Sequence, residues 1–256
     1  MDWSRTKTIF IITFLCLNIF LGYQLAEKRS AGNINILAQP TFHMDTNNIE
    51  ITIPNIEDNL TRSSISGTIP ILSETNLKEE LDGQEIQLLG DQIIHSVLEE
   101  PYSLVAGDMS AGVNDFLQQY VMNGEEYKIA EFNEEEGYIG LHQTHEGKAV
   151  HNFDERYHIR LELNDSLEIV EYTQTYMDIS KEGREQELLS PLKVIEILYD
   201  NNRIPENAVI DEAVLEYYSL IETSADFEFF IPMWRIRIND TYHIVNATNG
   251  EVRPID

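Results

Sequence analysis

The chain has 256 residues, of which 45 are acidic and 17 are Lys or Arg, so its formal net charge at pH 7 is −28. This excess of acid argues against nucleic acid or anionic lipid as a partner of the polar part of the chain, because phosphate binding needs clustered Lys and Arg. Apolar residues make up 42% of the sequence, which is enough to build a folded core. After the N-terminal segment, about 230 residues remain, enough for one large domain or two small ones.

An uncharged apolar segment, residues 9–25, dominates the N-terminus. As a helix it would extend roughly 26 Å, close to the ~30 Å hydrocarbon core of a bilayer. Arg5 and Lys7 precede it, and no small-x-small cleavage site follows it. We therefore expect an uncleaved transmembrane signal-anchor helix over residues 9–26, and not a cleaved signal peptide or a core helix. The tail, residues 1–8, is expected in the cytoplasm and the C-terminal part outside the cell membrane, which the chain would cross once.

One face of this expected membrane helix is a candidate partner-binding surface. Asn18, Gly22 and Ala26 lie four residues apart and so form one stripe. The small residues would let another helix come close, and the Asn18 amide could hydrogen-bond to it within the bilayer. Phe14 and Ile11 complete the candidate set. Two interpretations stay open: the stripe binds a partner helix, or it holds small residues that any membrane anchor tolerates.

Beyond the anchor, residues 27–48 are polar and are predicted to form a linker. A first extracytoplasmic α+β module is expected over residues 49–155. The alternation in Ile49–Ile53 predicts a strand, and the apolar spacing in Leu88–Glu99 predicts a helix. A second short helix is predicted for Val113–Tyr120. The later part of this module is predicted to contain strands at 127–132, 137–144 and 149–153.

A second extracytoplasmic α+β module is expected over residues 156–256. Ser190 and Pro191 predict a helix start, because Ser is a good N-cap and Pro is favoured at the first helical position. Residues 161–170 align with residues 236–245, each as strand, Asn-Asp and strand. Either the two modules are related repeats, or two hairpins simply look alike. The strands predicted here are 157–163, 167–177, 209–220, 227–238 and 242–247.

The seven histidines are the natural candidates for catalysis or metal binding. His142 and His145 are three apart in a predicted strand and would point to opposite faces, so they cannot chelate one ion without a bulge. With His151 and His158 they are either ordinary polar residues or part of a metal site in a loop. The sequence has no recognisable catalytic or metal-binding motif, so we expect no catalytic residue, no metal and no cofactor. A deep pocket lined by His142, His145 or His151 and a carboxylate would instead favour an extracytoplasmic hydrolase.

The residues Met1 to Ile11, which run directly into the apolar segment, resemble the start of the YycI (WalI) family of Gram-positive bacteria. The layout is also similar: one anchor, an acidic outer part and no disulfide, since the only cysteine, Cys16, lies in the anchor. Residues 231–238 and 249–252 resemble the terminal hairpin of PepSY-like modules. The resemblance implies a YycH/YycI-like fold, with two related modules of antiparallel sheet and packed helices.

The resemblance also implies a function. Members of the family associate with a sister protein, YycH (WalH), and with the essential sensor histidine kinase WalK (YycG), whose response regulator controls cell-wall metabolism. Contact is thought to run largely through the transmembrane helices. We therefore expect a non-enzymatic, membrane-anchored regulator of such a kinase. The alternative is an extracytoplasmic binding or inhibitory module that acts on a cell-wall enzyme through its acidic outer domain.

Overall fold

The computed structural model describes most of the chain beyond the expected linker. The described residues are 3, 7, 10, 11, 13–23, 48–54, 60–104, 109–221 and 226–253. Nearly all of the expected linker 27–48 and most of the expected tail 1–8 lie outside these residues, as does Ala26.

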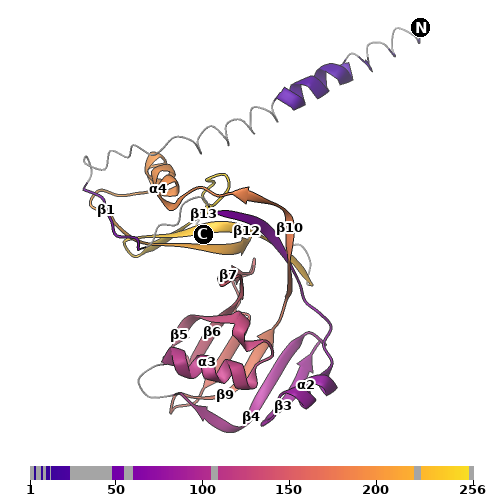
Figure 1. Ribbon diagram of the computed structural model, residues 1–256, viewed down its shortest axis with the longest axis vertical. Coiled ribbons are helices and arrows are strands. Elements are labelled where there is room, and N and C mark those ends of the chain that lie inside the picture. The colour runs from indigo at the N-terminus through magenta and orange to yellow at the C-terminus, as the bar shows by residue number, and fades with distance from the viewer. Residues whose placement is uncertain are drawn as a thin grey trace.

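Residues 13–23 form a helix that projects away from the folded body (Figure 1). None of the helices in the described residues combines the length and the apolar character that crossing a membrane requires. The transmembrane anchor over residues 9–26 stays a prediction.

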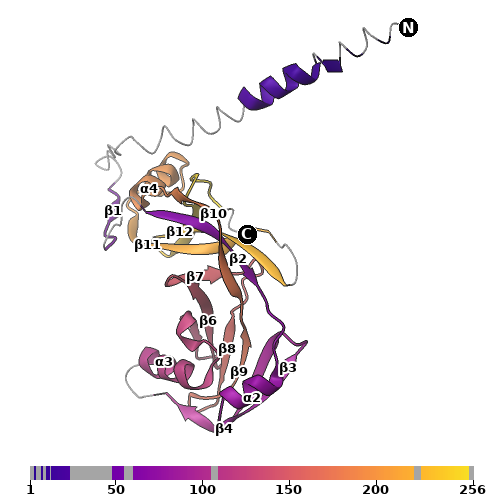
Figure 2. The same ribbon diagram turned by 45° about the vertical axis from the view of Figure 1, so that its right-hand side comes forward.

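The folded body consists of two lobes, each built on its own sheet (Figures 1 and 2). We call the one that holds the chain's later strands the terminal lobe and the other the middle lobe. The terminal lobe contains β1 (Glu50–Ile51), β2 (Thr61–Thr68), β10 (Asp178–Glu187), α4 (Pro191–Asp200), β11 (Val209–Ser219), β12 (Phe227–Ile238) and β13 (Thr241–Asn246). The middle lobe contains α2 (Glu74–Glu80), β3 (Gln84–Leu89), β4 (Ile93–Ser103), α3 (Met109–Tyr120), the 3-10 helix η2 (Gly124–Glu126), β5 (Tyr127–Asn133), β6 (Tyr138–His145), β8 (Ile159–Leu163) and β9 (Glu168–Thr175).

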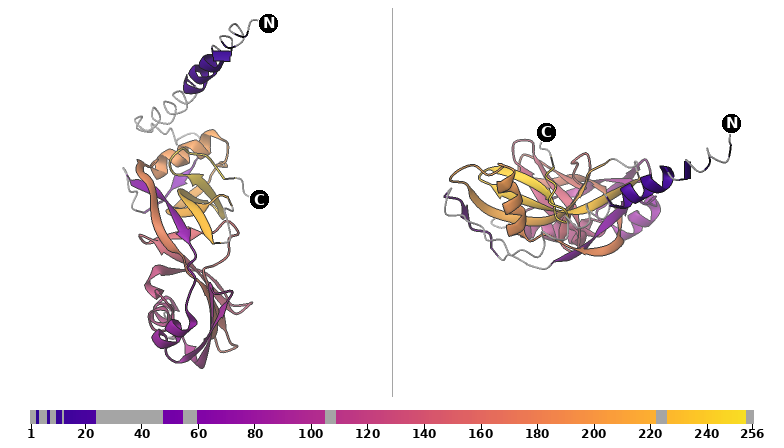
Figure 3. Two further views of the ribbon diagram at one scale, coloured as in Figure 1. Left: turned by 90° about the vertical axis from the view of Figure 1, so that its right-hand side faces the viewer. Right: turned by 90° about the horizontal axis from the view of Figure 1, so that it is seen from above.

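A short strand, β7 (Lys148–His151), joins the two sheets. It pairs antiparallel with β6 of the middle lobe and parallel with β11 of the terminal lobe. The strand order is β10-β2-β12-β11-β7-β6-β8-β9-β4-β3, with β1, β5 and β13 off this path. Figure 3 shows the lobes from the side, stacked along the long axis. β7 therefore lies at the junction between the lobes.

Along the sequence, the chain first forms part of the terminal lobe, then the middle lobe, and then the rest of the terminal lobe. β2 pairs with β10 and β12, although more than 100 residues separate it from either strand. β8 and β9 pair with β6 and β4 of the middle lobe. The strand pairing thus divides the chain differently from the boundary expected near residue 155.

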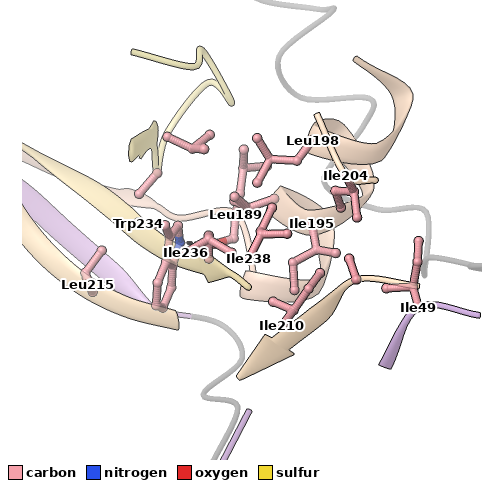
Figure 4. Packing of buried hydrophobic residues seen from close by; sticks show 14 of the residues in the cluster. Ile49, Leu189, Ile195, Leu198, Ile204, Ile210, Leu215, Trp234, Ile236 and Ile238 are labelled. Atoms are coloured by element: carbon pink, nitrogen blue, oxygen red, sulfur yellow. Dashed lines mark hydrogen bonds between the residues drawn. The ribbon is translucent and has the colours of Figure 1, made fainter. Parts of the chain in front are cut away.

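In the terminal lobe, α4 covers one face of the sheet (Figure 4). Ser190 caps the helix, since its Oγ accepts a hydrogen bond of 3.3 Å from the N–H of Lys193. The apolar face of α4 places Ile195 and Leu198 against Ile236 and its neighbours on the sheet. The helix start predicted from Ser190 and Pro191 is confirmed.

In the middle lobe, α3 packs its apolar face onto the other sheet. Val113, Phe116 and Leu117 are buried on this face. The ring of Phe116 stacks on Tyr120 at 5.2 Å and meets Tyr172 edge-on at 5.9 Å. Each lobe therefore has its own apolar core.

The helix predicted over Leu88–Glu99 is wrong, because this stretch belongs to the β3–β4 hairpin. Gly90 and Asp91 adopt positive φ angles of 62° and 59°, which reverse the chain where a helix would continue. After the turn, Ile94 and Leu98 point into the core with period two while Val97 is exposed. The apolar spacing alone fits a helix, but Gly90 favours a turn at this point and so indicates a hairpin.

Most other expectations from the sequence agree with the structure. The eight strands predicted from residue 127 to residue 247 are found, with ends within two residues of those expected. The helix predicted at 113–120 is α3, which begins four residues earlier. Of the strand predicted at 49–53, the structure has residues 50 and 51 as β1. Residues 161–170 and 236–245 both form hairpins.

Candidate functional site

The predicted partner-binding stripe is present in the structure as an uncovered helical face. Ile11, Phe14, Asn18 and Gly22 are all helical and exposed, with 68% and 65% exposure for the two large apolar side chains. A Cβ added at Gly22 would have no described atom within 4 Å apart from its chain neighbours and the backbone of its own helix. Ala26 lies outside the described residues. The role of the stripe stays a prediction.

A second candidate site is a cleft of about 480 Å³ where β7 joins the two sheets. We call it the junction cleft. β5 and β6 of the middle lobe and β11 and β12 of the terminal lobe all contribute to its walls. The lining side chains that carry polar groups are Lys128, Glu131, His142, Lys148, His151, Tyr157, Glu216 and Arg235.

Glu216 is the central anion of this cleft. It is only 6% exposed, and its Oε2 accepts hydrogen bonds from the hydroxyl of Tyr218 at 2.9 Å and the Nε of Arg235 at 3.0 Å. Nε2 of His151 lies 3.1 Å from the same oxygen. Burial would raise the pKa of the Glu216 carboxyl, but the hydrogen bond and charge of His151, with those of its other partners, hold the pKa below its usual value.

His151 is fixed in the cleft by its neighbours. Its ring stacks on Tyr218, with 4.2 Å between centroids and 3° between planes. The ring of His142 also lies close to it, with 4.3 Å between centroids and 56° between planes. Glu216, His151 and Tyr218 thus form one packed group that ties β7 to β11.

His142 has an unsatisfied polar atom. The residue is 7% exposed, and its Nδ1 is buried without a hydrogen-bond partner among the described residues. Burial, together with the nearby His151 and Arg235, lowers the pKa of His142 to about 3. The imidazole is therefore neutral at physiological pH and offers one N–H and one bare nitrogen.

His158, by contrast, is fully satisfied. Its Nδ1 accepts the backbone N–H of Gln143 at 3.1 Å, so its Nε2 carries the proton and donates to Oδ1 of Asn152 at 3.0 Å. Burial, with His142 and His151 nearby, lowers the pKa of His158 to about 3. These contacts assign His158 a structural role.

Tyr157 closes another wall of the cleft. Its ring lies so close to Gly140 that a Cβ added there would come within 2.5 Å of it. The Tyr157 hydroxyl donates a hydrogen bond to Glu131. Gly140 is therefore the residue that lets the Tyr157 ring pack flat against β6.

The structure brings together two of the three histidines that could line a pocket with a carboxylate. His142 and His151 meet Glu216, whereas His145 packs edge-on against Tyr217 at 5.9 Å. The described residues that line the cleft include no Ser, Thr or Cys. Across the described part of the chain, no three His, Cys, Asp or Glu side chains are placed to hold a metal ion.

The sequence analysis missed Glu216, Tyr218 and Arg235. One signal was available: Glu216 sits between Leu215 and Tyr217 in a strand whose residues are buried on both faces. A carboxylate in such a strand needs a partner, because an unpaired buried charge is costly. The partner itself could not be read from the sequence, since it lies on β12.

Two sheets that share the strand β7, with helices packed on each, define a two-lobed α+β protein. A sequence model described as "YycI protein" matches residues 34–248. The chain therefore belongs to the YycI family, as the N-terminal resemblance predicted.

A solved structure resembles the chain in fold. An uncharacterized protein from Eubacterium rectale aligns over 82% of this chain and 92% of its own, with 11% identity and a TM-score of 0.51. YycH from Bacillus subtilis aligns over 74% of this chain and 50% of its own, with 14% identity and a TM-score of 0.37. No protein with a curated function is similar enough to count as a match.

Proposed function

We propose that the chain regulates a two-component system by acting on a WalK/YycG-like sensor histidine kinase that controls cell-wall metabolism. The observation that carries this proposal is membership of the YycI family over residues 34–248. That family is a regulatory one, and its members act with a YycH-like sister protein. The chain acts without catalysing a reaction. In the junction cleft, the buried carboxylate of Glu216 is already engaged by three side chains, which supports this.

The regulator is anchored in the cell membrane by residues 9–26, with its N-terminus in the cytoplasm and both lobes outside. The helix packs against transmembrane helices of the kinase and biases the equilibrium between its signalling states. The uncharged sequence of residues 9–25 and the exposed apolar side chains of the helix support this mechanism. The sister protein shares the complex.

The contact through the stripe can be tested with two matched double variants. Asn18→Leu with Gly22→Leu changes the stripe, and Cys16→Leu with Phe20→Leu changes the opposite face, since each residue turns the helix by about 100°. The full chain is co-purified with the kinase from membranes. We expect about fivefold less kinase with the stripe variant, because interhelical contacts of this kind contribute about 1 kcal/mol.

The opposite-face variant should recover as much kinase as the unmodified chain. Equal recovery with both variants would contradict the stripe as the contact surface. If both variants lose the kinase, the whole helix and not one face makes the contact.

A further inference from the structure

We propose that the junction between the two lobes is acid-sensitive: protonation of two buried histidines, His142 and His158, releases β7 while both lobes stay folded. This inference goes beyond the proposed function and does not depend on it. Three features of the junction carry it: the short pairing of β7, a row of rings that crosses from one lobe to the other, and nitrogen atoms that have no place for a second proton.

The first feature is the short pairing of β7 with its two neighbours. It pairs with β6 through Lys148 and Ala149, and with β11 through Val150 and His151. By contrast, β11 pairs with β12 along nearly its whole length. Each lobe has its own apolar core, whereas the junction has a small separate cluster that includes Val150. Because segments with few hydrogen bonds and few buried apolar contacts open first, β7 can come loose while both cores stay closed.

The second feature is a row of four rings, His158, His142, His151 and Tyr218, which we call the histidine row. The ring centroids of His158 and His142 are 5.8 Å apart, and those of His142 and His151 are 4.3 Å apart. The ring of His151 then stacks on Tyr218 of the terminal lobe at 4.2 Å. Positive charges on neighbouring rings would repel each other strongly in a buried site. The row therefore packs closely only while His142 and His158 are neutral.

The third feature begins with the hydrogen bonds of His158. Its Nδ1 accepts the N–H of Gln143 on β6, and its Nε2 donates to Asn152, which directly follows β7. A second proton would lie on Nδ1 and face the N–H of Gln143, so this hydrogen bond would be lost. His158 is only 1% exposed, so water cannot replace the lost bond. Protonation therefore favours a state in which the segment after β7 leaves β6 and the ring reaches water.

His142 has no acceptor for a second proton either. In the doubly protonated ring both nitrogens carry a proton. The buried Nδ1 of His142 has no hydrogen-bond partner among the described residues, so its N–H would remain unpaired. Protonation of His142 thus also favours a state in which the junction is open to water.

The charged groups around the histidine row do not compensate for burial. Glu216 favours a charge on His142, but this carboxylate already pairs at 3.0 Å with Arg235, which opposes the charge. The other titratable side chains that line the cleft are Lys128, Glu131, Lys148 and Tyr157. Burial is therefore the main cause that lowers the pKa values of His142 and His158 to about 3.

Acid should favour opening, because the closed junction keeps both histidines neutral and the open junction exposes them. An exposed histidine has a pKa of about 6.5, so each of the two favours opening by up to about tenfold per pH unit below 6.5. Between pH 7 and pH 5.5, the opening equilibrium of β7 should therefore rise about 70-fold.

Hydrogen exchange of the full chain in detergent, followed by mass spectrometry at pH 7 and pH 5.5, tests the proposal. The rates are corrected for the intrinsic pH dependence of amide exchange. We expect the opening equilibrium of β7 to rise about 70-fold and, at both pH values, to exceed that of α3 and α4 at least about tenfold. A rise of less than about tenfold would overturn the proposal. Equal opening of β7, α3 and α4 would also overturn it, since β7 would then be released only when the whole chain unfolds.

Two variants each remove one titrating ring from the histidine row. His142→Phe keeps a ring of similar size, and His158→Gln keeps an oxygen that can accept the N–H of Gln143. Each should reduce the acid response of β7 from about 70-fold to about eightfold, because one of the two histidines remains. Either variant is sufficient if the other fails to fold.

His95→Gln is the matched control. It removes a histidine that lies outside the row and pairs with Glu171 of the middle lobe at 3.6 Å. This variant should keep the full acid response of β7. A full response in His142→Phe and His158→Gln as well, or a response that His95→Gln reduces equally, would overturn the assignment of the acid-sensitive groups.

Discussion

Large apolar side chains are buried in the two lobes but exposed in the N-terminal helix. In the lobes, Phe116 and Leu117 are at most 1% exposed. In the helix, Phe14 and Leu15 are 65% and 58% exposed. Folding energy thus comes from the lobes, whereas the apolar face of the helix remains available to partners outside the chain. The comparison separates a region that keeps the protein folded from a region that we propose transmits regulation.

The largest expected effect is on the core of the middle lobe. Phe116→Ala removes a buried ring that packs on Tyr120 and Tyr172, and should lower the free energy of unfolding by about 3–5 kcal/mol. Urea unfolding measures this change. Phe153→Ala, at a position 41% exposed, is the control and should cost less than about 1 kcal/mol. Similar losses for both variants would contradict the assigned core.

The pH dependence of stability should follow the buried histidines. The folded-state pKa values of His142 and His158 are lowered to about 3, so protons bind first to the unfolded chain as pH falls below about 6.5. Their stabilising contribution is present above pH 6.5 and is lost progressively between pH 6.5 and pH 3. Between pH 7 and pH 5.5, the free energy of unfolding should fall by about 2.5 kcal/mol.

His142→Phe sharpens this test, because it should remove about half of that fall. The groups facing His142 include His151, Glu216, Arg235, Tyr157 and His158. The lowered pKa of Glu216 acts in the same direction at lower pH. Stability that stays level or rises between pH 7 and pH 5.5 would show that these histidines are not buried neutral in the folded chain.

A smaller effect is expected at the helix caps, and the chain offers its own control. Ser190 caps α4 with a side-chain hydrogen bond, whereas Ser73 occupies the same position on α2 without one. Ser190→Ala should cost about 1 kcal/mol and Ser73→Ala only a few tenths. Thermal or urea unfolding of the two variants gives the difference directly. A reversed order would contradict the capping geometry.

The smallest effect is expected from the N-terminal helix. Cys16→Leu with Phe20→Leu should change the free energy of unfolding of the lobes by less than about 0.5 kcal/mol, because these residues belong to neither core. The measurement is urea unfolding of the full chain in detergent. A loss of 2 kcal/mol or more would mean that the helix packs on the lobes.

Local chemistry explains which parts of the fold the sequence could predict. The strands predicted at 137–144 and 149–153, which a turn with Glu146 and Gly147 at positive φ joins, and the cap at Ser190 depend on neighbouring residues, and both were predicted. The β2–β10 pairing could not be, because it joins strands more than 100 residues apart in the chain. The β3–β4 hairpin was missed because its apolar spacing also fits a helix.

The same distinction between local spacing and long-range pairing explains which candidate site the sequence could predict. The stripe with Asn18 and Gly22 follows from helical spacing alone, so the sequence was enough to propose it. The junction cleft depends on β7 pairing with both sheets, which brings His142 and Lys148 to Glu216. No sequence pattern within a single strand predicts that these residues come together.

The most direct test of the proposed function replaces residues 9–25 with a polyleucine helix of equal length and measures expression of the kinase's target genes in cells. The account predicts that regulation is lost, to the level seen without the protein, while the lobes unfold at the same urea concentration as before. Unchanged regulation with the polyleucine helix would contradict the account and would assign the activity to the acidic lobes.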